Sequence, residues 1–133
     1  MNPKHTLGKN ERLKRRKAIG ALFEGGRKCQ AHPLRALYRP VAAADGFRSG
    51  VTVSSRHFKK AVDRNRIKRL LREAWRLQKA ATQERLAREG RGLHVFLIYT
   101  GTELPDYALV RDKVSRILHL LNQWLDENPV APA

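Results

Sequence analysis

Cysteine is almost absent from this chain, since Cys29 is the single one among 133 residues. One cysteine cannot form an internal disulfide, which excludes the framework of a small disulfide-rich secreted domain. A lone thiol without a paired histidine gives no sign of a thiol enzyme either, and we interpret Cys29 as structural. The cysteine content fits a reducing compartment, so we expect a cytoplasmic location.

Carboxylates are also scarce, with 12 Asp plus Glu against 28 Lys plus Arg. They are dispersed along the chain, so no pair is placed to bind a catalytic magnesium ion. The sequence has no HExxH, no cluster of Cys and His, no GxxxxGK followed by Ser or Thr, and no GxSxG. We therefore expect this protein to supply no catalytic residue and to bind no metal itself.

Long apolar runs are missing as well. No stretch approaches the ~20 apolar residues of a membrane span. The basic N-terminal sequence MNPKHTLGKNERLKRRK is followed by no apolar segment of the secretory-signal type. We expect no signal peptide and no membrane partner.

What the chain has in excess is positive charge, +16 in total. A compact body with that charge repels itself unless an anion neutralises it, so the expected partner is a polyanion. Ten Lys or Arg lie between Arg56 and Lys79, where Asp63 and Glu73 are the only acids. An ordinary solvated helix surface mixes charges of both signs, and this imbalance favours a binding face instead.

The sequence KKAVDRNRIKRLLREAWR, residues 59–76, separates cations from apolar residues if it is helical. At about 100° per residue, one side has an apolar set that predicts packing on a core: Ile67, Leu70, Leu71, Ala74 and Leu77. The opposite side has a polar set that predicts contact with phosphate: Asn65, Lys68, Arg69, Arg72 and Arg76.

The remaining pattern predicts one domain over residues 1–133, with a core of about 10–126 and flexible tails at 1–9 and 127–133. A first helix is expected from about Asn10 to Phe23, with Leu13 on its apolar stripe and Gly25 at its end. Strands are expected at 34–39 and 47–54, paired as a hairpin, and a strand buried on both faces is expected at 93–99. One long helix should run from about residue 58 to 88, and a last amphipathic helix should follow residues 105–106.

The segment FKKAVDRNRIKRLLREAWR, residues 58–76, resembles the RNR motif of the bacterial ribonuclease P protein component. That motif has a Lys-rich approach, Ala-Val, any residue, RNR, an aliphatic residue, KR, two aliphatic residues and RE. Upstream, RLKRRKAIGALFEGGRK is similar to the opening of the family, and LRALYRP and FRSGVTVS are similar to its hairpin strands. Downstream, LHVFLIY and the closing helix match in kind and position. The resemblance covers about residues 10–125.

This resemblance implies an α+β fold, a single small domain of order αβββαβα. Its central, mostly antiparallel four-stranded sheet would have helices packed on it, similar to ribosomal protein S5 domain 2. The resemblance adds a short first strand near residues 27–30, which the local polar pattern does not show.

The function implied is that of the protein subunit of ribonuclease P, which removes the 5′ leader from precursor tRNA by phosphodiester hydrolysis. In that family the active site and its Mg²⁺ ions belong to the RNA subunit. The implied partners are the catalytic RNA and precursor tRNA, and no DNA partner is expected.

Carried over residue by residue, the motif implies contacts to the RNA subunit from one set of polar side chains: Arg64, Asn65, Arg66, Lys68, Arg69, Arg72 and Arg76. Arg64 and Arg66 lie toward the flanks of the polar face, so one of them could instead anchor the helix against the protein body. Contacts of this kind position a nucleic acid without reading its sequence.

The resemblance also implies a groove for the single-stranded leader between the first helix and the sheet. Phe23 and Tyr38 would be aromatic platforms for bases, and Arg56, Lys59 and Lys60 would supply positive charge. For Phe23, plain core packing is the competing interpretation.

Two departures from the family pattern affect this groove. Ile19 stands where the family often has a second aromatic residue, so weaker leader contacts are expected. Ser55 stands where the family tends to have Lys or Arg, and Arg56 could take over that charge.

Other classes of protein fit part of the pattern. A ribosomal or translation-associated RNA-binding protein without a nuclease role would share the basicity and the lack of catalytic groups, and it is the main alternative. A self-sufficient nuclease is opposed by the missing metal ligands. A nonspecific DNA-binding architectural protein would bind duplex DNA as well as RNA, which a leader groove does not predict.

Overall fold

The computed structural model describes residues 16–129. The expected start of the first helix near Asn10, the apolar position Leu13 and the tail at 1–9 lie outside these residues. The elements, in chain order, are α1 (Arg16–Gly25), β1 (Arg27–Ala31), β2 (Leu34–Val41), the short 3₁₀ helix η2 (Ala43–Asp45), β3 (Phe47–Val53), α2 (Ala61–Gln78), α3 (Ala80–Glu89), β4 (Gly92–Tyr99) and α4 (Tyr107–Glu127).

The four strands form one sheet in the order β1-β2-β4-β3. The pairs β1–β2 and β2–β4 are antiparallel, whereas β3 and β4 are parallel. The predicted mixed, mostly antiparallel sheet is therefore confirmed, and so is the short first strand. The predicted central position of the strand at residues 93–99 is also confirmed, because β4 has a neighbour on each side.

The predicted hairpin of residues 34–39 with 47–54 is wrong, because β4 lies between β2 and β3. The hairpin is instead β1–β2, which the two-residue turn at His32 and Pro33 connects. The physical reason lies in β4, which is buried along almost its whole length. A strand without a polar face is most stable inside the sheet, so it separates two strands that are closer to each other in the sequence.

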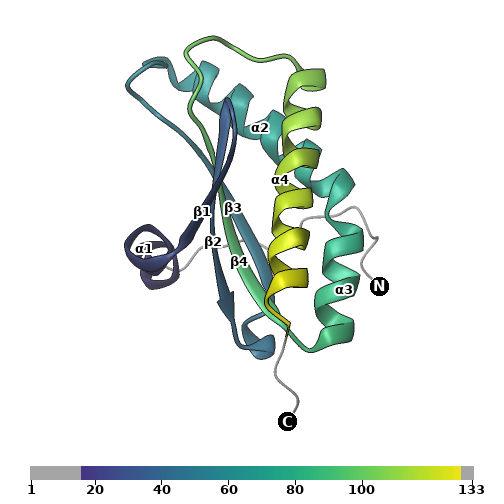
Figure 1. Cartoon of the computed structure of the whole chain (residues 1–133). Coiled ribbons are helices and arrows are strands. Elements are labelled where there is room, and N and C mark those ends of the chain that lie inside the picture. The colour runs from purple at the N-terminus through teal and green to yellow at the C-terminus, as the bar shows by residue number, and fades with distance from the viewer. Residues whose placement is uncertain (1–15, 130–133) are drawn as a thin grey trace, which may run out of the picture.

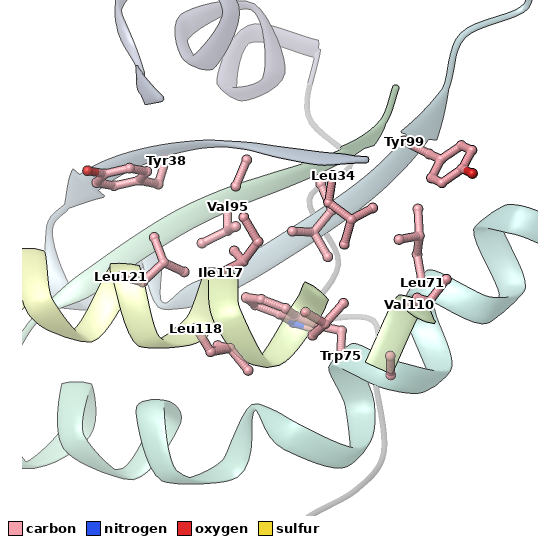
Figure 2. Close-up of a cluster of buried hydrophobic side chains, with 14 of the residues drawn as sticks. Leu34, Tyr38, Leu71, Trp75, Val95, Tyr99, Val110, Ile117, Leu118 and Leu121 are labelled. Carbon is pink, nitrogen blue, oxygen red and sulfur yellow. The ribbon is translucent and has the colours of Figure 1, made fainter. Parts of the chain in front are cut away.

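The two faces of the sheet are covered differently. In Figure 1, α1 lies on one face, while α2, α3 and α4 lie on the other. The larger core fills the second face, where side chains of β2 and β4 meet those of α2 and α4 (Figure 2). A smaller cluster of Leu22, Leu37 and Phe96 lies beneath α1. The α1 face is thus only partly covered.

The predicted single helix from about 58 to 88 is two helices, divided at Lys79. The side chain of Lys79 is 2% exposed, and its Nζ donates to Gln83 Oε1 at 3.0 Å. After the division α3 packs along the end of α4, where Asn122 Nδ2 donates to Thr82 Oγ1 at 2.9 Å (Figure 1). One straight helix could not pack on both the sheet and the end of α4. The hydrophobic periodicity of the sequence is the same on both sides of the division, so it does not predict this change of direction.

The last helix begins where it was predicted. Asp106 is its N-cap, and its carboxylate accepts a hydrogen bond from the backbone N–H of Leu109 at 2.8 Å. A side-chain acceptor of this kind satisfies an N–H group that has no partner within the helix.

Cys29 lies in β1 and packs against the larger core. Burial raises the pKa of its thiol to about 11. Little reactive thiolate is therefore present at neutral pH, which agrees with a structural role.

Candidate nucleic acid interface

Helix α2 has a buried apolar side and an exposed polar side, much as its sequence predicts. Ile67, Leu71 and Ala74 are fully buried in the larger core. Leu77 was predicted on this apolar side but is 41% exposed, while Trp75 is 1% exposed and packs against Phe47. Near the end of α2 it is therefore Trp75, and not Leu77, that belongs to the larger core.

The opposite side of α2 consists of exposed polar residues, which we call the α2 cationic face. Asn65, Arg66, Arg69 and Arg72 are exposed, and Lys68 is half-buried beside them. Among the described residues, no ion pair joins these cations to a carboxylate. Four cations without acidic partners on one helix make a surface suited to the phosphate backbone of a nucleic acid.

Arg76 differs from these cations because it is paired. Its guanidinium donates to the carboxylate of Glu73, one turn earlier, through both Nε and Nη2. This hydrogen bond, with the charge of Arg76, lowers the pKa of Glu73. An acid on the same helix therefore holds an arginine in place here. Arg76 lies on the predicted side of α2, but its charge is partly compensated before any partner binds.

Arg64 is turned toward the protein rather than toward solvent. Its Nη1 donates to the carbonyl oxygens of Phe58 at 2.7 Å and Lys59 at 2.8 Å. Both carbonyls belong to residues 54–60, the connection between β3 and α2. Arg64 is thus the anchoring arginine that the sequence allowed for, and Arg66 is the exposed one.

The β3–α2 connection, residues 54–60, presents the three cations predicted for the leader groove. Phe58 is 6% exposed and packs against Tyr99, so it fixes the connection to the core. Arg56, Lys59 and Lys60 are all exposed around it. A buried aromatic ring and the Arg64 hydrogen bonds therefore hold a cationic loop in place.

The two predicted aromatic platforms lie on opposite faces of the sheet. Phe23 is 53% exposed on α1, and its ring contacts Phe96 edge-on at 5.6 Å. Tyr38 is 7% exposed, belongs to the core cluster on the α4 side (Figure 2), and packs against Trp124 at 5.6 Å. Contrary to the prediction, Tyr38 is therefore not in a groove with Phe23. Because side chains alternate along a strand, its neighbour Leu37 is the residue that faces α1.

Three polar residues on the α1 face were missed in the sequence: Arg39, His94 and Arg48. They come from β2, β4 and β3, and they line a hollow beside α1. Their signal was the alternation with apolar neighbours along each strand: His94 lies between the core residues Leu93 and Val95, and Arg39 and Arg48 directly follow Tyr38 and Phe47. That signal identifies a face only once the strand order is known.

Within residues 16–129 no group of three or more His, Cys, Asp or Glu side chains could hold a metal ion. In the same part of the chain, no helix is both long enough and apolar enough to span a membrane. A mixed sheet that positions an exposed cationic helix and a cationic loop defines an α+β protein of the nucleic-acid-binding class.

Comparison with known proteins identifies the family. The model of the ribonuclease P family matches residues 7–122. The ribonuclease P protein component of Chlorobium phaeobacteroides is 34% identical, over 86% of this chain and 87% of its own length. That of Porphyromonas gingivalis is also 34% identical, over 84% of this chain and 83% of its own length.

Solved structures agree on the fold. The ribonuclease P protein of Thermotoga maritima has a TM-score of 0.61 and 27% identity, covering 85% of this chain and 96% of that one. The Staphylococcus aureus protein has a TM-score of 0.64 at 17% identity, covering 84% of this chain and 94% of that one, and it bears on the fold alone.

The chain belongs to the bacterial ribonuclease P protein component family. As the protein component of that ribonucleoprotein endonuclease, it acts in the 5′ processing of precursor tRNA, and membership implies association with ribonuclease P RNA. The resemblance stated from the RNR motif and the predicted α+β fold are both confirmed.

Proposed function

We propose that the α2 cationic face binds the phosphate backbone of the ribonuclease P RNA in the cytoplasm. The observation behind this proposal is the absence of acidic partners for Arg66, Lys68, Arg69 and Arg72 among the described residues. Their charges are available to release counterions from an RNA. On this proposal the RNA subunit supplies both the Mg²⁺ ions and the cleavage chemistry.

Reconstitution tests this assignment. The purified chain is combined with a bacterial ribonuclease P RNA, and precursor-tRNA cleavage is measured at low magnesium beside protein alone and RNA alone. We expect the protein to stimulate correct 5′ cleavage by the RNA and to be inert alone. Cleavage by protein alone would contradict an RNA-borne active site. RNA binding without stimulation would favour the ribosomal or translation-associated alternative.

The second part of the proposal concerns the single-stranded leader of precursor tRNA. Phe23 offers a half-exposed ring on the α1 face, where a base could stack. The cationic β3–α2 connection follows directly after the end of β3. The ring of Phe23 contacts Phe96 of β4, and Phe96 pairs with Gly50 of β3 in the sheet. A strand of RNA passing Phe23 along β3 would therefore approach Arg56, Lys59 and Lys60.

Replacing Phe23 by Leu should weaken leader binding while largely preserving the packing on Phe96. Base stacking on an aromatic ring contributes about 1–3 kcal/mol, so we expect roughly a 5-fold to 150-fold loss of affinity of the reconstituted enzyme for leader-bearing precursor tRNA. Affinity for mature tRNA, which has no leader, should stay unchanged. The measurement is equilibrium binding of both RNAs.

Two further variants control this experiment. Phe23→Tyr keeps an aromatic ring and should bind the leader nearly as wild type does. Tyr38→Phe changes a residue on the other face and should have no effect on the leader. Equal losses for both RNAs in Phe23→Leu would instead support plain core packing as the role of Phe23.

A further inference from the structure

The β3–α2 connection, residues 54–60, is fixed at three points. It begins after Val53, the last residue of β3, which pairs with Tyr99 at the end of β4. In its middle, the ring of Phe58 packs against the ring of Tyr99, with 5.9 Å between the two centroids. From α2, the side chain of Arg64 donates to the carbonyl oxygen of Phe58. Two of the three points therefore depend on Tyr99.

Tyr99 is buried although it has a polar group. It is 3% exposed and lies at the opposite end of the core from Tyr38 (Figure 2). Its hydroxyl donates to the backbone oxygen of Glu103 at 2.6 Å, so the buried group is satisfied. Burial raises the pKa of Tyr99, and the charge of Glu103 acts in the same direction. The hydroxyl therefore stays protonated and remains a donor at neutral pH.

The residues after Tyr99 close around its ring. The backbone N–H and the hydroxyl of Thr100 donate to the carbonyl oxygen of Pro33, in the turn between β1 and β2, at 2.8 and 3.1 Å. Gly101 follows and is buried. A Cβ atom at position 101 would lie 2.5 Å from the hydroxyl oxygen of Tyr99 and 2.7 Å from its Cζ. The observed position of the ring therefore requires a residue without a side chain at position 101.

The connection that Tyr99 supports has three exposed cations, Arg56, Lys59 and Lys60. A long side chain loses conformational freedom when it binds a phosphate, and a mobile backbone adds to that loss. Lys59 directly follows the buried Phe58, so its backbone is already fixed before any RNA binds. The affinity of this cationic loop should therefore depend on the aromatic contact beneath it.

We infer that Tyr99 is a positioning residue for the binding of precursor tRNA. Its ring holds Phe58, and through Phe58 it places Lys59 and Lys60 at the start of α2. Tyr99 acts from within the larger core, on the face of the sheet away from α1, and contacts no RNA itself. The inference rests on the proposed leader function of the connection. It identifies a residue outside the cationic surfaces whose loss weakens leader binding.

Replacing Tyr99 by Leu removes the ring that supports Phe58. We expect the reconstituted enzyme to bind leader-bearing precursor tRNA about fivefold more weakly near 0.1 M salt, which is the contribution of about one phosphate contact. The loss should appear in KM, while kcat at saturating precursor tRNA and the affinity for mature tRNA stay unchanged. Tyr99→Phe keeps the ring on Phe58 and should bind nearly as wild type does.

Gly101→Ala displaces the same ring without changing Tyr99. The added methyl group would overlap the end of the tyrosine side chain. Gly101 is not among the glycines with a positive φ, so the effect is one of space and not of backbone strain. We expect the same leader-selective loss as in Tyr99→Leu.

Leu121→Val is the control for general damage to the core. Leu121 is 1% exposed and lies near Tyr38, at the other end of the core from Tyr99 (Figure 2). A smaller side chain there should lower stability, because it leaves a cavity. Affinity for both RNAs should stay at the wild-type value below the melting temperature.

Limited digestion of the free protein with trypsin gives a readout without RNA. Trypsin cleaves after lysine and arginine, and the three exposed cations of the connection are sites for it. A segment that is held in place resists cleavage, whereas local opening exposes it. We expect faster cleavage within residues 54–60 in the two variants that disturb the ring, but not in Tyr99→Phe or the core control. Cleavage after Arg116 of α4 is the internal reference for general unfolding.

The outcomes separate this inference from the proposed function. Faster cleavage of the connection with a selective loss of leader affinity, both rescued in Tyr99→Phe, supports it. Unchanged cleavage in both ring variants would overturn it, as would equal losses for precursor and mature tRNA. If cleavage rises without a loss of leader affinity, the double variant Lys59→Gln, Lys60→Gln is measured. Weaker leader binding there overturns the role of Tyr99 alone, whereas unchanged binding overturns the leader function and the inference with it.

Discussion

The triple variant Arg66→Ala, Arg69→Ala, Arg72→Ala should lose roughly 10²- to 10³-fold of its affinity for ribonuclease P RNA near 0.1 M salt. These three arginines are the exposed ones on the α2 cationic face. Each phosphate contact contributes about 0.7–0.9 to the slope of log affinity against log salt concentration. Removing three contacts should therefore reduce that slope by about two to three, which filter binding over a series of salt concentrations measures.

The control for this variant removes the same charge elsewhere. Arg88, Arg111 and Arg116 are exposed on α3 and α4. Their replacement by Ala changes the net charge equally, so a long-range effect of net charge alone would weaken binding to the same extent in both variants. We expect the control to keep most of the affinity and nearly the wild-type slope. Equal behaviour of the two triple variants would contradict a specific RNA contact at α2.

Replacing Arg64 by Met should destabilise the fold rather than remove a phosphate contact. Met keeps an aliphatic stem but cannot donate to the carbonyls of Phe58 and Lys59. The Phe58 bond is part-buried, so its oxygen would lose a charge-assisted partner, whereas water can replace the exposed Lys59 bond. We expect a loss of about 2 kcal/mol in the free energy of unfolding, measured by urea denaturation.

The RNA affinity of Arg64→Met should also fall, but its dependence on salt concentration should differ from that of the triple variant. The β3–α2 connection would lose its fixed position, and its exposed lysines would be less well ordered for binding. The salt slope should change little, because no phosphate contact is removed.

Arg69→Met is the matched comparison on the same helix. It should leave stability within about 0.5 kcal/mol of wild type, as surface substitutions usually do. Its salt slope should fall by about 0.7–0.9. If Arg64→Met instead kept full stability and lost slope as Arg69→Met does, Arg64 would be an RNA contact, as the motif alone implies.

The elements that the sequence predicted best are those with a strong local pattern. The separation of cations from apolar residues on α2 follows from helical periodicity, and the uniformly apolar β4 predicts a central strand. The capped start of α4 follows from Pro105 and Asp106 together. In each case the physical signal lies within a few residues of the element itself.

The predictions that failed depend on contacts between distant segments. The β2–β3 hairpin was the natural choice for two strands joined by a short turn, but β4 arrives later in the chain and separates them. The division at Lys79 likewise depends on where α4 lies. Local propensity carries no information about partners that are far away in sequence.

Net charge and helical periodicity by themselves determined the expected class of partner and the helix that presents the cationic face, because both are written along the chain. The family followed from the resemblance of residues 58–76 to the RNR motif. Only the tertiary structure decided which of these residues are exposed and which pack against the protein itself. It turned Arg64 inward and placed Tyr38 in the core, since one residue of strand alternation moves a side chain to the other face. It also aligned Arg39, His94 and Arg48 in one row, because only strand pairing brings three separate segments into register.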